Sequence, residues 1–486
     1  MIYQTKKEKP SLDEIFSPRG VAIVGASPSG GWATSVLQFL KEAEFPNIYP
    51  VNPNYQEVLG LPCYPSLGSI PGPVDHVIVS IRAESVLELL DECAAKGVKS
   101  VHFFTAGFSE TGNTERAGLE KAMLDKAKAG GFRIIGPNSL GLMVPKSRLV
   151  NNIRIPLEPG PIAVISQSGG YVEDIPLFGS PRGLRFSKIV SYGNALDVNE
   201  CELLEYFSID PETRIIAIYI EGVRDGRRFV KALREATARK PVVICKGGTT
   251  EAGRRTTRSH TASLTSSVAV FNALCRQMKA IQVDDIEELT DMLVALQFVN
   301  PLPQGSGVAI IGAGGGISVQ ADDEMEKAGL HLPPFSPEAQ SELKGFLPLA
   351  GSIFSNPLDA DTIYSPKNIA AALRVVGRVP DVHMLIYHLG FHPVSRWRGG
   401  RFSAETYLKP VSDAIRELQQ TTGKPVLLAL RPPPDLESMK EFLTAQEAFV
   451  AAGLPVFHSM RRTARAIARL VAWRQTQNSL PLNQDH

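Results

Sequence analysis

The sequence has no apolar run long enough to cross a bilayer, few cysteines and almost no net charge. Its first ten residues contain no apolar core, so we expect no signal peptide. The cysteines are odd in number and form no CxxC pair, which argues against a disulfide framework and a zinc site and is typical of the reducing cytoplasm. They are Cys63, Cys93, Cys201, Cys245 and Cys275. The net charge of +1 predicts neither nucleic acid nor a membrane as a partner.

What the chain does have is a regular alternation of short apolar runs and amphipathic segments. Its 486 residues, 43% hydrophobic and 21% charged, are typical of a globular protein with several domains. Buried strands are predicted at 20–25, 47–51, 74–81, 101–104 and 132–135, and helices at 32–44, 86–96 and 114–129. Strand and helix in turn predict a doubly wound parallel sheet. The alternation resumes twice, which predicts three α/β domains at 1–150, 151–300 and 301–486.

A glycine-rich turn at 25–31 follows the first predicted strand and precedes a helix. Helix N-termini present unpaired amides, so this turn is a candidate phosphate site. A dinucleotide fingerprint needs a second glycine where this chain has Ser27, and an acidic residue where it has Asn52-Pro53-Asn54. The pattern therefore favours a nucleotide ligand other than NAD. A purely structural tight turn is the alternative.

The second predicted domain carries three polar features after apolar strands. Ser166-Gln167-Ser168-Gly169 forms a candidate anion turn, Glu221 follows the strand 215–220, and His260 lies in a polar, cation-rich segment that we read as a loop. A histidine that accepts a phosphoryl group needs a carboxylate on its other nitrogen and N–H donors for the phosphate. The alternatives are a solvated loop histidine and a surface acid at Glu221.

Motifs of the first domain resemble the CoA-binding domain of the NDP-forming acyl-CoA synthetases, relatives of the succinyl-CoA synthetase α-subunit. These motifs are Gly25-Ala26-Ser27, Val51-Asn52-Pro53, Thr105-Ala106-Gly107-Phe108 and Gly136-Pro137-Asn138. The resemblance implies a Rossmann-like domain whose first turn, with Ser29, holds the CoA phosphates. It also implies that further residues line the path of CoA, namely Asn52, Pro53, Arg82, Thr105, Ala106, Gly107 and Asn138.

The second domain resembles the same family in the order and spacing of its motifs. They are Ser166-Gln167-Ser168-Gly169, Ser191-Tyr192-Gly193-Asn194 with Asp197, Tyr219-Ile220-Glu221-Gly222, and Ser259-His260-Thr261 with Ser263-Leu264. The resemblance implies that His260 is phosphorylated, that Glu221 orients it, and that Ser166, Gln167, Ser168 and Gly169 bind phosphate. The chain departs from the family pattern at Ala262, Ser266 and Val268, and at Pro176, where a helix should continue.

The third domain begins after a proline- and glycine-rich linker at 300–307 and has a glycine-rich turn at 312–316. The segment 355–359 resembles the family's carboxyl-terminal ligase domain, so the resemblance covers about residues 12 to 474 and implies two flavodoxin-like domains after the first. His383, His388 and His392 lie on one strand and its loop, a spacing that does not make a metal site, and we predict no metal. No stretch resembles the family's ATP-grasp domains.

The sequence therefore predicts the α-subunit of an NDP-forming acyl-CoA synthetase in the cytoplasm. Such an enzyme interconverts acid, CoA and nucleoside triphosphate with acyl-CoA, diphosphate and phosphate, through acyl phosphate and phosphohistidine. The missing ATP-grasp region implies an oligomer in which a separate β-subunit binds the Mg-nucleotide. The alternatives are a CoA-binding or acyl-CoA-binding protein with a degenerate phosphohistidine loop, and an NAD(P)-linked oxidoreductase that has only two glycine turns in its favour.

Overall fold

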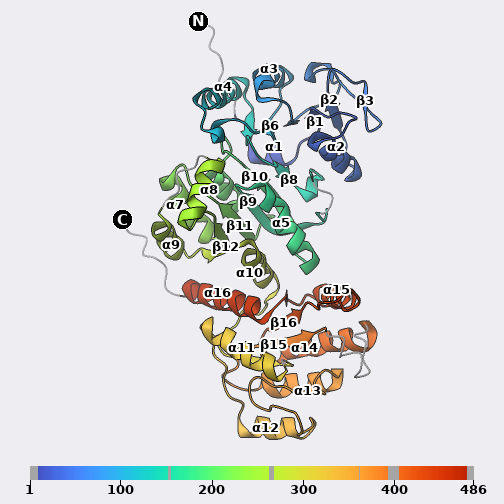
Figure 1. Ribbon diagram of the computed structural model, residues 1–486, viewed down its shortest axis with the longest axis vertical. Coiled ribbons are helices and arrows are strands. Elements are labelled where there is room, and N and C mark those ends of the chain that lie inside the picture. The colour runs from blue at the N-terminus through green and yellow to red at the C-terminus, as the bar shows by residue number, and fades with distance from the viewer. Residues whose placement is uncertain are drawn as a thin grey trace. The chain divides into compact units, whose positions relative to one another are not determined.

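The computed structural model of the protein describes residues 9–151, 155–261, 267–312, 314–360, 362–391 and 404–478. The chain forms two compact units (Figure 1). The first contains Met1–Ser180 and Arg185–Leu289, and the second contains Pro181–Leu184 and Thr290–His486. The first unit holds a five-stranded and a six-stranded sheet, and the second unit holds a four-stranded sheet.

The five-stranded sheet is parallel, with the order β2-β1-β5-β6-β7. Its strands are β1 (Val21–Val24), β2 (Ile48–Val51), β5 (His76–Val79), β6 (Ser100–Phe103) and β7 (Arg133–Ile135). Alternate residues of β1 face two different apolar cores, as a period of two requires. Helix α2 (Trp32–Glu42) packs in one core, and α3 (Val86–Lys96) and α4 (Thr114–Gly130) pack in the other. The predicted doubly wound α/β class is confirmed for this sheet.

The six-stranded sheet has the order β13-β12-β11-β9-β10-β8. Its parallel strands are β9 (Pro159–Ser166), β10 (Phe186–Ser191), β11 (Ile215–Ile220), β12 (Val242–Lys246) and β13 (Ile281–Val283), and β8 (Leu142–Met143) joins β10 antiparallel at the edge. Its helices are α5 (Gly169–Gly179), α6 (Glu200–Ile209), α7 (Gly226–Thr237), α8 (Glu251–Thr261), α9 (Val268–Gln277) and α10 (Ile286–Phe298). The continuous apolar runs of β9 and β11 form central strands because helices cover both faces.

The structure corrects the loop predicted around His260. Residues 251–261 form helix α8, so His260 lies in its last turn and not in a loop. Ala262, Ser263, Leu264, Thr265 and Ser266 fall outside the described residues, and Val268 is the first residue of α9. Helix α5 continues through the buried Pro176 to Gly179, so the missing donor of Pro176 does not end the helix.

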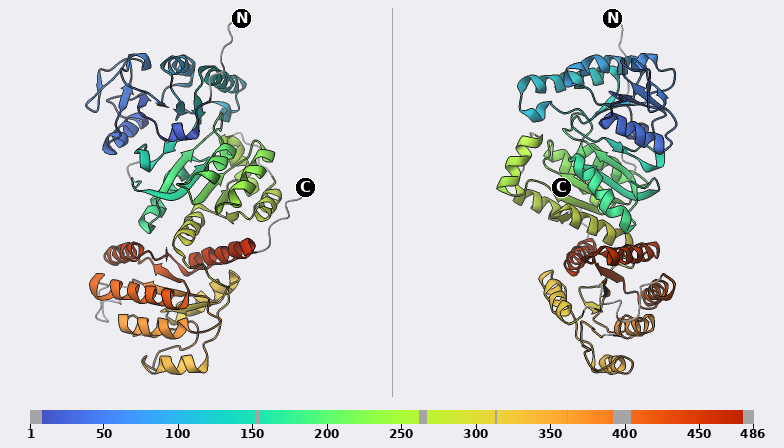
Figure 2. Two further views of the ribbon diagram at one scale, coloured as in Figure 1. Left: turned by 180° about the vertical axis from the view of Figure 1, so that it is seen from behind. Right: turned by 45° about the vertical axis from the view of Figure 1, so that its right-hand side comes forward.

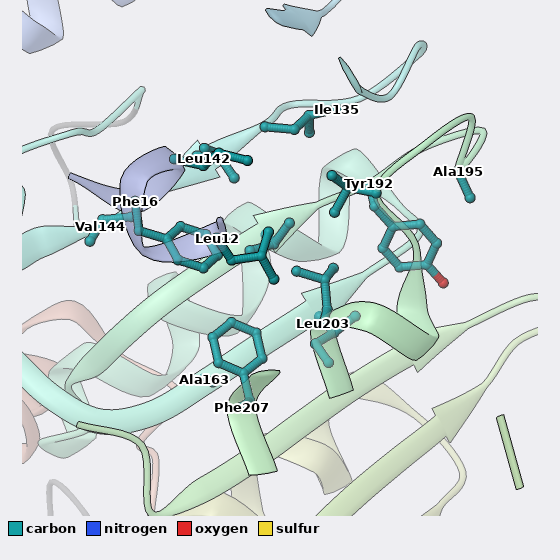
Figure 3. Packing of buried hydrophobic residues seen from close by; sticks show 14 of the residues in the cluster. Leu12, Phe16, Ile135, Leu142, Val144, Ala163, Tyr192, Ala195, Leu203 and Phe207 are labelled. Atoms are coloured by element: carbon teal, nitrogen blue, oxygen red, sulfur yellow. The ribbon is translucent and has the colours of Figure 1, made fainter. Parts of the chain in front are cut away.

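A shared apolar core joins the two sheets of the first unit. Helix α1 (Leu12–Phe16) comes from the start of the chain, yet its apolar side chains lie against helix α6 and β8 of the second sheet (Figure 3). The ring of Phe16 lies 5.3 Å from that of Tyr206 and 6.0 Å from that of Phe207. The N-terminal segment therefore ties both sheets into one unit.

The second unit is built on the parallel order β14-β15-β16-β17. Its strands are β14 (Val308–Ile311), β15 (Met384–Gly390), β16 (Val426–Arg431) and β17 (Val456–Phe457). Helices α13 (Pro366–Gly377), α14 (Lys409–Thr422) and α15 (Leu436–Ala451) share one core with the sheet, and α11 (Gly315–Lys327) packs on α16 (Met460–Asn478) (Figure 2). Helix α12 (Pro337–Lys344) also packs against this core of the second unit. Among the described helices, none combines the length and the apolar character needed to cross a membrane.

A buried ionic cluster forms a second link between the two sheets of the first unit. Arg133 of β7 contacts the Asp197 carboxylate at 2.7 Å and that of Glu202 at 2.6 Å, and the Arg133 side chain is only 2% exposed. Lys9 contacts Asp197 from the solvent side. Burial raises the pKa of Asp197, but the hydrogen bonds and positive charge of Arg133 outweigh burial, so this pKa lies below its ordinary value. Asp197 is therefore charged when the protein is folded.

We expect Asp197→Asn to lower the free energy of unfolding of the first unit by about 3 kcal/mol near neutral pH, because Arg133 keeps a buried charge with less compensation. The pKa of Asp197 is lower in the folded than in the unfolded state. Its contribution is thus present above about pH 4 and is lost as the pH falls through the folded value. Denaturant unfolding at several pH values should show the difference between wild type and variant shrinking in acid.

The control is Glu205→Gln, which removes the partner of the half-exposed Arg228. This exposed pair should contribute less than about 1 kcal/mol. Equal losses of stability in the two variants would contradict a special role for the buried cluster.

Candidate functional site

The first glycine-rich turn has an open helix N-terminus. Gly25 has a φ of +98°, and a Cβ at this position would lie 2.4 Å from the carbonyl oxygen of Ser80, so only glycine fits. The Asn52 side chain donates to the carbonyl of Ala26 at 2.9 Å, which fastens the turn to the end of β2. The N-cap of α2 is Gly31, whose lack of a side chain leaves the first amides of α2 without a side-chain cap. This geometry suits an anion.

Ser27 and Ser29, which are also predicted CoA residues, belong to the same turn. The hydroxyls of Ser27 and Ser29 lie 2.6 Å apart and are exposed, and Pro53 is exposed beside Asn52. Ser27 is also held by Thr34, whose hydroxyl donates to the Ser27 carbonyl at 2.9 Å. The turn therefore presents hydroxyls and amides together at the carboxyl edge of the sheet.

A cavity of about 700 Å³ lies where the strand ends of the two sheets in the first unit meet. Seven of the predicted site residues line it, four from the first sheet and three from the second. They are Arg82, Thr105, Ala106, Asn138, Gln167, Ser168 and Gly169. The cavity thus brings predicted CoA residues and the predicted phosphate turn to one place. Other predicted site residues do not line the cavity. Those with described side chains are Gly25, Ala26, Ser27, Ser29, Asn52, Pro53, Gly107, Ser166 and Glu221.

The first-sheet wall of the cavity is a chain of hydrogen-bonded loops. Thr105 donates through its hydroxyl to the carbonyl of Ile81 at 2.8 Å, and the amide of Asn138 donates to the carbonyl of Thr105 at 3.0 Å. Asn138 itself has a φ of +55°, a conformation that asparagine tolerates. His102 lies 2.9 Å from the carbonyl of Ser139, and burial lowers the pKa of His102 to about 4. A neutral histidine therefore fixes this turn at physiological pH.

The second-sheet wall is the anion turn at the start of α5. Ser168 is the N-cap of this helix, and its hydroxyl accepts from the amide of Tyr171 at 3.5 Å. The hydroxyl of Ser166, which is fully buried, donates to the Ser168 carbonyl at 2.8 Å. A Cβ on Gly169 would lie 3.2 Å from the side chain of Leu140, which also lines the cavity. The turn is thus fixed from behind, and it presents the N-terminus of α5 to the cavity.

Gln167 connects the anion turn directly to Glu221. Its side-chain oxygen accepts from the amide of Glu221 at 2.9 Å and from that of Gly222 at 3.3 Å. Glu221 is only 6% exposed, so the alternative that it is a surface acid is wrong. The Tyr219 hydroxyl donates to the Glu221 carboxylate at 3.3 Å. Burial raises the pKa of Tyr219, and the charge of Glu221 raises it further.

Lys246 is a part of this site that the sequence reasoning missed. It ends β12, is 4% exposed, and donates to the carbonyls of Glu221 and Gly247 at 2.6 and 2.5 Å. Burial lowers the pKa of Lys246, against the charge of Glu221. A charged residue that ends an otherwise apolar strand, at the same sheet edge as Glu221, was the available signal. Phe104 and Glu173, which also line the cavity, lie in segments with no comparable signal.

His260 is placed only through its backbone, since its side chain lies outside the described atoms. Helix α8 follows β12 at the carboxyl edge of the sheet, the edge at which Glu221 follows β11. Thr257 of α8 is buried, and a Cβ on Gly248 would lie 2.8 Å from its hydroxyl. The helix that carries His260 therefore folds back onto the end of β12.

We expect Gln167→Ala to lower the free energy of unfolding by about 1–3 kcal/mol, because two buried amides lose their acceptor. Hydrogen exchange of the Glu221 and Gly222 amides should accelerate, which mass spectrometry measures. The control is Gln38→Ala on α2, where the side chain donates to the exposed Glu42. Unchanged exchange at Glu221 and Gly222 would contradict the role of Gln167.

Family models and relatives agree with this arrangement. Residues 19–145 match the CoA binding domain model, and residues 159–296 match the model of the succinyl-CoA ligase like flavodoxin domain. The chain is 34% identical to the α subunit of ADP-forming acetate–CoA ligase II of Pyrococcus furiosus, over 95% of this chain and 97% of that one. It is 31% identical to ADP-forming acetate–CoA ligase I of Archaeoglobus fulgidus, but spans only 63% of its length.

A solved structure is also similar along almost the entire chain. It is acetyl-coenzyme A synthetase 1 of Candidatus Korarchaeum cryptofilum in complex with phosphate and ADP, with a TM-score of 0.79 and 30% identity. The match covers 97% of this chain and 100% of that chain. The family predicted from the motifs is therefore confirmed, as is a CoA-binding domain followed by a flavodoxin-like domain. The chain belongs to the family of ADP-forming acyl-CoA synthetases, ligases that include the α subunits of the ADP-forming acetate–CoA ligases.

Proposed function

We propose that this chain is the catalytic α-subunit that interconverts an acyl-CoA and phosphate with free CoA, a carboxylic acid and a phosphorylated His260. The observation that carries the proposal is the cavity shared by Arg82, Thr105, Ala106 and Asn138 and the turn 166–169. We also propose three functional domains, at 1–150, 151–300 and 301–486. A thioester and a phosphate can react only if they are held side by side, and this cavity is large enough to hold both.

CoA binding is proposed to start at the first turn. The amides and hydroxyls of the turn 25–29 bind a phosphate group of CoA, because the start of α2 has no side-chain cap. The pantetheine then passes Asn52, Pro53 and Arg82 and reaches the loop 105–107 and Asn138. Its thiol ends in the cavity, next to the start of α5.

The reaction is proposed to run in two transfers. A phosphate oxygen, held by the turn 166–169, attacks the thioester carbonyl. The carbon–sulfur bond breaks, CoA leaves as a thiolate that is then protonated, and an acyl phosphate forms. A neutral imidazole nitrogen of His260 then attacks the phosphorus, and the acid leaves as its carboxylate. Glu221 accepts a hydrogen bond from the other ring nitrogen, and the amides of α5 stabilise the transferred phosphoryl group.

The nucleotide step is proposed to need a second chain. The relative from Pyrococcus furiosus is named a subunit, and the present chain spans almost all of it. We propose a cytoplasmic hetero-oligomer in which an ATP-grasp β-subunit binds the Mg-nucleotide and exchanges the phosphoryl group with His260. Acetate, the acid named for these relatives, is the first substrate to test.

Phosphorylation of the isolated chain tests the proposal. Incubation with acetyl-CoA and labelled phosphate should give a protein label that is stable in base and labile in acid, and His260→Ala should abolish it. The control is His331→Ala, which changes an exposed histidine of the second unit. If CoA binds but no label forms, the chain is instead a CoA-binding protein with a degenerate phosphohistidine segment.

We expect Glu221→Gln to slow the phosphorylation by roughly 100-fold, because a neutral amide does not stabilise the imidazole charge that develops during transfer. Glutamine retains the shape of the side chain and can still accept from Tyr219, so folding should be preserved. Rapid-quench kinetics at saturating acetyl-CoA and phosphate measure the rate. A Glu221→Gln rate within twofold of wild type would remove Glu221 from the mechanism.

A further inference from the structure

Asn194 belongs to the motif Ser191-Tyr192-Gly193-Asn194. The proposed reaction assigns it no contact with a substrate. Its side chain is 2% exposed and lies in the loop after β10 of the second sheet. Its amide nitrogen donates to the Glu110 carboxylate at 2.6 Å and to the Glu120 carboxylate at 3.0 Å. Both carboxylates come from the first sheet's helical connections. One buried amide therefore links two acidic side chains across the seam between the two sheets.

These two carboxylates hold the loop that carries three predicted CoA residues. The other oxygen of Glu110 accepts from the amides of Gly107 and Phe108, at 2.5 and 3.1 Å. Glu120 accepts from the Ser109 amide at 3.3 Å and from its hydroxyl at 2.8 Å. The loop 105–109 is thus fixed by hydrogen bonds to charged acceptors, which are the stronger kind. Asn194 donates a hydrogen bond to each of these acceptors.

The backbone at Gly193 and Asn194 also contacts the turn 136–138, which belongs to the first-sheet wall of the cavity. The amide of Asn194 donates to the carbonyl of Pro137 at 3.0 Å. Gly193, which lines the cavity, has a φ of +50°, and a Cβ there would lie 2.2 Å from that same carbonyl. Only glycine permits this approach, and the approach brings Asn194 within reach of both acids.

The short helix that contains Glu110 also contacts α8, the helix that carries His260. Glu110 lies in the short helix η3 (Ser109–Thr111), and helix α8 packs against η3. A shift of η3 would therefore displace both the loop 105–109 and α8. Asn194 is thus linked through Glu110 to the short helix on which α8 packs.

We propose that Asn194 is a positioning residue that holds the loop 105–109 in its CoA-binding shape and couples that loop to helix α8. The inference rests on the proposed function, since it assigns CoA to this loop and phosphorylation to His260. It deepens that function by adding a residue that touches neither reactant. Loss of Asn194 should weaken CoA binding and leave the phosphate turn, which Ser166 and Gln167 fix independently, unchanged.

The test compares Asn194→Ala with Asn199→Ala. Asn199 caps α6 through the amides of Cys201 and Glu202, so its loss lowers stability without touching the loop. Titration calorimetry should show the Kd for CoA rising about tenfold in Asn194→Ala, the size expected for losing hydrogen bonds to charged groups. In the phosphorylation reaction, the KM for acetyl-CoA should rise similarly while the KM for phosphate stays within about twofold. Asn199→Ala should change neither constant.

An exchange of donor and acceptor provides a second test. Asn194→Asp places a third carboxylate beside Glu110 and Glu120 and should weaken CoA binding more than Asn194→Ala. Adding Glu110→Gln restores an amide–carboxylate pair in reverse order and should recover part of the affinity. Equal CoA affinity in wild type and Asn194→Ala, or equal losses in Asn194→Ala and Asn199→Ala, would overturn the proposal.

Hydrogen exchange separates this inference from the proposed function. Without any ligand, the Gly107 and Phe108 amides should exchange at least about tenfold faster in Asn194→Ala than in Asn199→Ala, because Glu110 loses its anchor. Unchanged exchange would overturn the positioning role even if the wild-type chain is phosphorylated. Faster exchange in a chain that neither binds CoA nor becomes phosphorylated would contradict the proposed function and leave the positioning of the loop standing.

Discussion

The buried contact of Arg133 with Asp197 and Glu202 is the interaction on which the site depends. It joins the end of the first sheet to the loop and helix that follow β10 of the second sheet. Such a buried ionic cluster gains little net stability over apolar packing, but its directional hydrogen bonds accept only one geometry. The apolar core around helix α1 holds the two sheets together, and the ionic cluster fixes the position of one sheet relative to the other. Because that position is fixed, the loops of the two sheets can form one cavity.

The chemistry of the candidate site, in the cavity and beside it, follows from where parallel strands end. The carboxyl ends of β5, β6 and β7 provide Arg82, Thr105 and Asn138, and those of β9, β11 and β12 provide Gln167, Glu221 and Lys246. Glycines at 25 and 193 permit close backbone approach, and the helix starts at α2 and α5 provide unpaired amides. Gln167 then ties the anion turn to Glu221, so that the phosphate site and the carboxylate form one rigid element.

Much of this could be predicted from the sequence because it is local. An apolar run predicted β11 with its observed bounds, and the glycine turns identified the helix starts. Helix α8 was missed because its only buried described side chain is Thr257, so the segment has no apolar stripe and contains several β-branched residues. The partners of Asn194 and Arg133 were beyond prediction, since Glu110, Glu120 and Asp197 are separated from them by more than sixty positions. The burial of Lys246 likewise depends on neighbouring strands.

In the proposed mechanism, one cavity holds the reactive end of CoA beside the phosphate turn. A crystal structure of the chain with CoA and phosphate tests it most directly. We expect the pantetheine thiol among Thr105, Asn138 and Gly169, with phosphate at the amides that begin α5. A pantetheine that leaves the first turn in another direction, or a phosphate bound away from the turn 166–169, would contradict it.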